Sequence, residues 1–133
     1  MTEPSWQWIK EISVLAIHDA QISEHGGMNG IRDFSLLLSA LAKPLNLDAY
    51  GSPDAADLAA SYASGLVHNH PFFDGNKRTA WVIAEVFLLK HGYQLVADNQ
   101  SGVKIMLAFS AGTISETDLS SWYRSHIIKN ASE

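Results

Sequence analysis

The segment from Asn76 to His91 most constrains the fold, because it is apolar on nearly every side of a helix. Its large apolar side chains are Trp81, Val82, Ile83, Val86, Phe87 and Leu88. A helix without a polar face must lie inside a protein, with other segments packed around it. The apolar run is interrupted by Glu85 and is too short to cross a bilayer, so we expect this helix at the centre of a folded domain.

The rest of the chain repeats the pattern of amphipathic helices. A first helix is expected to end at the Gly26-Gly27 pair, and Asp33 can cap a second helix. The second helix is expected to end before Pro44, and the segment 43–53, which contains two prolines, is predicted to be a loop. Three further helices are predicted at 54–69, 101–111 and 115–128, the last opened by a capping box, with an extended piece at 93–96. The chain is therefore predicted to be all-α, an irregular bundle of about six helices around the buried central helix.

The composition is that of one folded domain, expected to span residues 1–133. Hydrophobic residues make up 47% of the chain and charged residues 17%, as in soluble globular proteins. The absence of cysteine excludes disulfides and thiolate chemistry, and a net charge of −5 argues against nucleic-acid binding. The first ten residues contain no apolar stretch typical of a signal peptide, so we expect the protein in the cytoplasm.

The candidate site is a nine-residue segment between the third predicted helix and the central one. It reads His70-Pro71-Phe72-Phe73-Asp74-Gly75-Asn76-Lys77-Arg78. Pro71 disfavours helical geometry at the residue before it, so the chain leaves its helix at His70 and presents the imidazole at a helix end. Gly75 permits a positive φ or a close backbone approach, and the backbone N–H groups that follow it form a ready anion site. Phe72 and Phe73 are predicted to anchor the loop in the core.

The charged and titratable residues of this segment suit phosphate chemistry. Lys77 and Arg78 lie in the first turn of the central helix, where the helix dipole disfavours each cation by about 0.3–1 kcal/mol. A bound polyanion would convert that penalty into a gain. Asp74 supplies a carboxylate for a phosphate-bound Mg²⁺, and His70 can be a neutral base at cellular pH. Together these groups predict phosphoryl or nucleotidyl transfer.

The nine-residue loop resembles the signature of the Fic superfamily, and specifically of its death-on-curing (Doc) toxin branch. Similar pieces extend the resemblance over nearly the whole chain: Ile17-His18-Asp19, His25-Gly26-Gly27, Gly30-Ile31-Arg32-Asp33 and Ser39-Ala40-Leu41. The resemblance implies a Fic/Doc-like helical fold in which His70 deprotonates a protein hydroxyl and Asp74 positions Mg²⁺. It also implies that the phosphates of ATP are bound by Gly75, Asn76, Lys77 and Arg78.

Position 77 bears on which reaction the resemblance implies. Fic adenylyltransferases usually have a small residue, commonly Gly, where this chain and the Doc branch have a lysine, Lys77. A lysine side chain would occupy part of the cradle that holds the distal phosphates, which fits the reversed nucleotide and γ-phosphate transfer of the Doc branch. Gly75, by contrast, agrees with the Fic pattern and departs from the Ala of some Doc members, so adenylylation stays open.

By resemblance, the chain is a toxin of a type II toxin–antitoxin system that phosphorylates a threonine of elongation factor Tu and arrests translation. We find no inhibitory Ser/Thr-x-x-x-Glu-Gly/Asn motif in the sequence, so inhibition is expected from a small antitoxin. The disordered tail of such an antitoxin would fold into a groove on the toxin. The predicted loop 43–53 lies where Fic proteins have a flap that aligns the target segment.

Three alternatives stay open. The first is a Fic-type adenylyltransferase, which transfers AMP to a protein hydroxyl. The second is a metal-dependent phosphohydrolase built on His18 and Asp19, although neighbouring helical residues point in different directions. The third is a non-catalytic helical binding module. The target protein, the antitoxin, the oligomeric state and the roles of His18, Asp19, His25 and His68 are not determined by the sequence.

Overall fold

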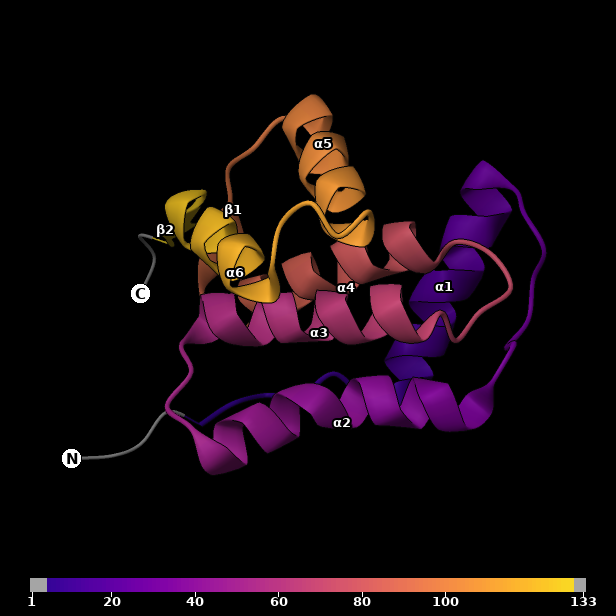
Figure 1. Cartoon of the computed structure of the whole chain (residues 1–133), viewed down its shortest axis with the longest axis horizontal. Helices are drawn as coiled ribbons and strands as arrows, with labels where there is room; N and C mark the ends of the chain where they lie inside the picture. The colour runs from indigo at the N-terminus through magenta and orange to yellow at the C-terminus, as the bar shows by residue number, and fades with distance from the viewer. Residues whose placement is uncertain (1–4, 131–133) are drawn as a thin grey trace.

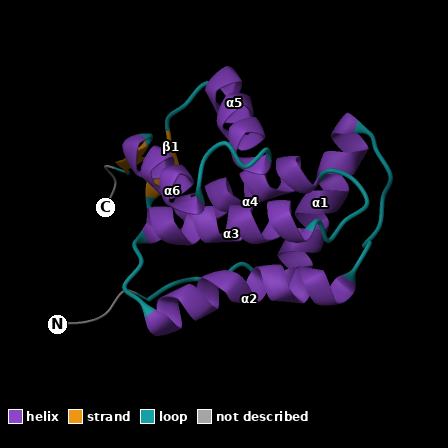
Figure 2. Ribbon diagram, viewed as in Figure 1, coloured by secondary structure: helices purple, strands orange, loops and turns teal. Residues whose placement is uncertain are grey.

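The computed structural model describes residues 5–130, which form six helices and one small two-stranded sheet (Figures 1 and 2). In chain order the elements are α1 (Glu11–His25), α2 (Phe34–Tyr50), α3 (Ala55–Asn69), α4 (Asn76–Lys90), β1 (Tyr93–Leu95), α5 (Asn99–Ser110), α6 (Glu116–Ser125) and β2 (Ile127–Lys129). The predicted all-α bundle of about six helices is confirmed. No helix within the described range is both long and apolar enough to span a membrane.

Helix α3 lies at the centre and packs against α2, α4 and α6 (Figure 1). Every residue from Ala55 to Val67 except Asp57 is buried. Small residues allow the close approach of the helices, since a Cβ added to Gly65 would lie 2.9 Å from the carbonyl oxygen of Ala40 on α2. Helix α4, which we predicted at the centre, lies beside α3 and has exposed residues near both of its ends, Lys77 and Arg78 at one and Leu89 and Lys90 at the other. The core is therefore shared by two neighbouring helices.

Helix α2 continues through Pro44, so both the predicted helix end before Pro44 and the predicted loop over 43–53 are wrong. Proline inside a helix removes one hydrogen bond and costs about 3 kcal/mol. Tertiary contacts offset this cost, because Pro44 is itself buried and Asp48 in the next turn accepts a hydrogen bond from the Trp6 indole at 3.1 Å. The connection to α3 is reduced to residues 51–54, and the loop expected as a flap is mostly helix.

The C-terminal part also departs from the prediction. The helix predicted over 115–128 ends at Ser125, because the residues after it pair as β2 with β1 in antiparallel register. Strand β1 confirms the extended piece predicted at 93–96, but its partner strand was not predicted. A three-residue strand has little pattern of its own, and its pairing depends on a distant segment. The predicted capping box is confirmed, since Ser115 and Asp118 exchange hydrogen bonds between side chain and backbone at 3.0 Å.

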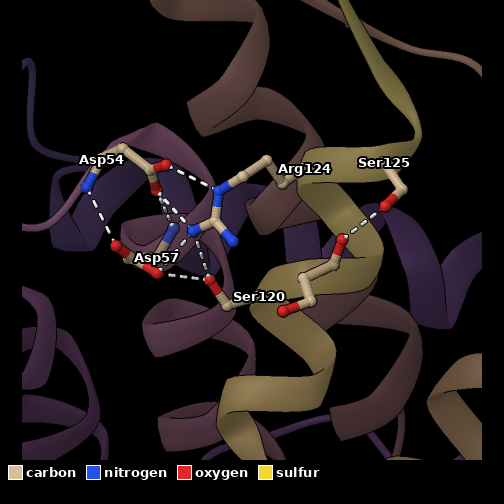
Figure 3. A network of polar contacts seen from close by, with 6 residues as sticks. Asp54, Asp57, Ser120, Arg124 and Ser125 are labelled. Atoms are coloured by element: carbon tan, nitrogen blue, oxygen red, sulfur yellow. Dashed lines mark hydrogen bonds and ion pairs between the residues drawn. The ribbon is translucent and has the colours of Figure 1, made fainter.

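A network of charged residues joins the start of α3 to α6 (Figure 3). The Arg124 guanidinium contacts Asp54 at 2.8 and 3.0 Å and Asp57 at 2.8 Å. Ser120 donates a further hydrogen bond to Asp57. Asp54 also caps α3, because its side chain accepts from the Asp57 N–H at 2.9 Å. The pKa of Asp54 is lowered to about 2, mainly by the hydrogen bond from Arg124 and to a smaller extent by those from Asp57.

We predict that this network makes stability depend on pH below 4. The pKa of Asp54 is about 2 in the folded protein, against an ordinary value of 3.8. Its contribution to stability is therefore complete above pH 3.8 and is lost as the pH falls from there through 2. Because the side chains of Asp54 and Arg124 are half exposed, solvent limits this contribution to about 1 kcal/mol or less. In acid titrations of the unfolding free energy, Asp54→Asn should weaken the dependence between pH 4 and 2, and an unchanged dependence would contradict the assignment.

Candidate functional site

His70 follows the last residue of α3 with a left-handed backbone, at φ 52° and ψ 54°. It is the single non-glycine residue with a positive φ in the described part of the chain. Glycine or asparagine normally occupies such a position, because a side chain there costs about 1–2 kcal/mol. The chain leaves its helix at His70, as predicted from Pro71, and His70 is exposed. Strain of this kind marks His70 as a candidate functional residue.

The segment before α2 holds one side of the loop. Ile31 forms an isolated antiparallel bridge with Phe72. The backbone N–H groups of Arg32 and Asp33 both donate to the Pro71 carbonyl, at 2.7 and 3.0 Å. The side chain of Asp33 also caps α2, as predicted. The start of α2 and the loop are therefore one connected unit.

The Asn76 side chain closes the loop from inside and determines the hydrogen bonding of His70. Its Oδ1 accepts from the Phe72 N–H at 3.0 Å and its Nδ2 donates to the Phe72 carbonyl at 2.9 Å, which fixes the orientation of the amide. The same Nδ2 lies 3.0 Å from His70 Nδ1. Nδ1 therefore accepts a hydrogen bond, and the neutral ring carries its proton on Nε2. Because the Asn76 side chain is buried and fully engaged, only its backbone N–H is available to an anion.

Phe72 lies beneath the loop and stacks on His18 of α1, with ring centroids 3.7 Å apart and planes 8° from parallel. Both residues are buried, and His18 Nε2 donates to the Asp74 carbonyl at 2.8 Å. The predicted anchoring role is confirmed for Phe72. The same prediction is wrong for Phe73, which is 44% exposed and lies against Gly30.

The Asp74 carboxylate has one oxygen engaged, while the other makes no hydrogen bond to the described residues. Its Oδ2 accepts from the Met28 N–H at 2.6 Å, and a Cβ added to Gly27 would lie 3.0 Å from the Asp74 Cβ. Residues 5–130 contain no group of three His, Asp or Glu side chains that could hold a metal ion. A single carboxylate fits a Mg²⁺ ion that takes its other ligands from phosphates and water, as is usual at nucleotide sites.

The N-terminus of α4 has no side-chain cap among the described residues and faces a cavity. Gly75 precedes it at φ 78°, the positive value that its sequence position predicted. Lys77 and Arg78 are exposed in the first turn, and Arg78 donates to the Gly26 carbonyl at 3.1 Å. The cavity measures about 390 Å³ and is lined by His70, Asp74 and residues 75–78, together with Val67, Phe73 and Ser110. The structure thus brings all six predicted site residues to one cavity.

The three histidines whose roles the sequence left open, His18, His25 and His68, do not gather into a metal site within the described residues. His18 lies beneath the loop, whereas its neighbour Asp19 is exposed. His25 is exposed at the end of α1. The ring of His68 packs against Phe109, with centroids 4.8 Å apart. These positions give no support to a metal-dependent phosphohydrolase.

Several residues outside the loop contact the site, and among these the sequence did not assign such a role to His18, Arg32 or Ser110. For His18 a signal exists, because it lies four residues after the buried Val14 and therefore on the inner face of α1. Arg32 lies in one of the pieces that resemble the Doc branch, but the resemblance gave it no role. Ser110 has no comparable signal, because only the packing of separate segments brings it to the loop.

Residues 8–88, more than half of the chain and including the whole loop, match the model of the Fic/DOC family. The chain therefore belongs to this family, and the resemblance inferred from its signature loop is confirmed.

Its curated relatives include a protein named as a toxin, one named as a protein kinase and one named as a protein adenylyltransferase. The chain is 46% identical to "Toxin Doc" of Mycolicibacterium smegmatis over 77 residues, which cover 55% of this chain and 58% of that protein. It is 30% identical to "Protein kinase doc" of Escherichia phage P1 over 112 residues, which cover 84% of this chain and 88% of the phage protein. It is 36% identical to "Protein adenylyltransferase Fic" of Drosophila ananassae over 64 residues, which cover 48% of this chain and 13% of the fly protein.

Proposed function

We propose that this chain is the toxin of a type II toxin–antitoxin system and acts as an ATP-dependent protein kinase of the Doc type. The reaction would move the γ-phosphoryl group of ATP to a protein hydroxyl and release ADP. We propose that residues 1–133 form the single domain that carries it out. One observation carries the proposal: an imidazole, a carboxylate, two cations and an uncapped helix N-terminus line one cavity. Phosphoryl transfer uses each of these groups, for proton transfer, metal binding and neutralisation of phosphate charge.

His70 is proposed as the base that accepts the hydroxyl proton. The lone pair of its neutral ring lies on Nδ1, to which Asn76 donates a hydrogen bond at 3.0 Å. Proton uptake at Nδ1 therefore requires this hydrogen bond to open when the acceptor hydroxyl binds. Such rearrangement is common, because catalytic hydrogen bonds often reach their final geometry only in the complex with substrate.

The phosphates are proposed to bind at the start of α4. Lys77 and Arg78 supply two positive charges, and the N–H groups of the uncapped helix end supply hydrogen bonds along the helix dipole. Asn76 contributes through its backbone, because its side chain is engaged within the loop. A Mg²⁺ ion bound to the available oxygen of Asp74 would neutralise phosphate charge.

Two observations favour phosphate transfer over AMP transfer. Lys77 lines the cavity at the helix end where distal phosphates would lie. The phage relative that is named a protein kinase matches over 88% of its length, whereas the adenylyltransferase matches over 13%. Adenylyl transfer is the alternative, since Gly75 agrees with the Fic pattern. A non-catalytic module is disfavoured, because it would gain nothing from the strained backbone of His70.

The partners are proposed from the resemblance and from a second, mainly apolar groove. The target would be a threonine of elongation factor Tu in the cytoplasm. The tail of the antitoxin would fold into the groove, which measures about 300 Å³ and lies between α1, α4 and α5. Lys77 and Arg78 line this groove as well as the candidate cavity. A bound segment with acidic residues would therefore compete with phosphates for both cations.

Labelled ATP distinguishes the proposed reactions. With elongation factor Tu or a cell extract as acceptor, we expect protein to be labelled from γ-labelled ATP and not from α-labelled ATP. If protein is labelled only from α-labelled ATP, the chain is an adenylyltransferase and not a kinase. If protein is labelled from neither, the result favours the non-catalytic binding module. Mass spectrometry of the modified protein then identifies the added group and the modified residue.

A further inference from the structure

His70 is held in its disfavoured backbone conformation by a residue of the segment before α2. The Arg32 guanidinium donates from Nε to the His70 carbonyl at 2.7 Å and from Nη2 to the Asn69 carbonyl at 2.9 Å. The backbone N–H of Arg32 donates to the following carbonyl, that of Pro71, at 2.7 Å. One residue thus binds three successive carbonyls at the point where the chain leaves α3.

These hydrogen bonds determine the conformation of His70 itself. The Asn69 carbonyl belongs to the peptide plane that turns with φ of His70, and the His70 carbonyl belongs to the plane that turns with ψ. A planar guanidinium that binds both oxygens fixes the two planes relative to each other, and so holds φ at 52° and ψ at 54°. The positive charge also lies at the C-terminal end of α3, where the helix dipole favours it.

We propose that Arg32 is a positioning residue that directs the His70 imidazole toward Asn76 and the cavity. Arg32 is not part of the cavity lining, so it acts through the backbone of His70. The catalytic consequence rests on the proposed function, whereas the orientation of the ring can be measured without it. Lysine at position 32 should not fully replace arginine in holding the backbone of His70, because one ammonium group lacks the two fixed donors of the guanidinium fork.

The first test is the ¹⁵N NMR spectrum of the histidine rings in the wild-type chain, Arg32→Ala and Arg32→Lys. The His70 signals are assigned by comparison with His70→Ala. The wild-type chain should show an unprotonated Nδ1 and a protonated Nε2, as the hydrogen bond from Asn76 requires. Both Arg32 variants should lose this single tautomer and give averaged nitrogen shifts.

The second test is the kinetics of transfer to the protein acceptor. For Arg32→Ala, kcat should fall by about 10²-fold, because the base is displaced, while KM for ATP should change by less than about twofold. For Arg32→Lys, kcat should fall by a smaller factor. If Arg32→Ala does not fold, Arg32→Lys decides the question in both tests.

Arg124→Ala is the matched control, because Arg124 also joins α3 to another segment but binds Asp54, Asp57 and Ser120 and not the backbone of His70. It should leave the His70 spectrum and kcat unchanged, even where it lowers stability. A wild-type His70 spectrum in the folded Arg32 variants would overturn the proposal. If instead the spectrum changes as expected but the wild-type chain transfers no phosphate, the proposed function fails and the positioning role stands.

Discussion

Replacing His70 by alanine is expected to lower the rate of phosphoryl transfer by about 10²–10⁴-fold, the range typical of removing a general base. The change removes the imidazole from the cavity lining and leaves Asp74, Lys77 and Arg78 in place. ATP should therefore still bind, and the loss should fall on kcat while KM for ATP is retained. Single-turnover transfer from γ-labelled ATP, together with calorimetry of nucleotide binding, measures both quantities. Expression of the variant should no longer arrest growth.

His68→Ala is the matched control for this experiment. His68 lies on the same helix, two residues before His70, but its ring packs against Phe109 and is not part of the cavity lining. This variant should keep the wild-type rate. Equal losses in the two variants would point to damage of α3, and full activity of His70→Ala would remove His70 from the mechanism.

Most of the candidate site could be predicted because its residues are consecutive in the chain. Pro71 limits the backbone conformation of His70, and Gly75 permits a positive φ before α4. Both effects are local in the sequence, and they concern residues that line the cavity. The support of the loop could not be predicted in this way. Arg32 contacts the backbone of a residue 38 positions away, and His18 contacts one 56 positions away. Such contacts depend on the packing of whole helices, which local patterns do not describe.

The fold shows the same limit. Helices were predicted from periodicity, and the caps at Asp33 and Ser115 formed as expected. At Pro44 the local rule was outweighed by tertiary contacts of the second half of α2. Helix α3 was not placed at the centre because its alanines and serines carry a weak hydrophobic signal. Those same small side chains allow helices to approach it on three sides.

The second large effect is expected from Phe72→Ala, which should lower the free energy of unfolding by about 3–5 kcal/mol. The ring is completely buried, so its removal loses the transfer free energy of the side chain and leaves a cavity. It also stacks on His18 at a centroid distance of 3.7 Å, so the loop loses the surface on which it rests. Chemical denaturation at neutral pH measures the change directly.

Phe73→Ala is the matched control, because it removes the same side chain from the next position of the loop. The ring of Phe73 is 44% exposed, so this change should cost less than about 1 kcal/mol. Where Phe72→Ala stays folded, the rate of phosphoryl transfer should also decrease. Asn76 binds the backbone of Phe72 and also binds His70, so a shift of this backbone after loss of the ring displaces His70. Equal and small effects of the two substitutions would contradict the buried anchor, and with it the fixed loop geometry that the proposed chemistry requires.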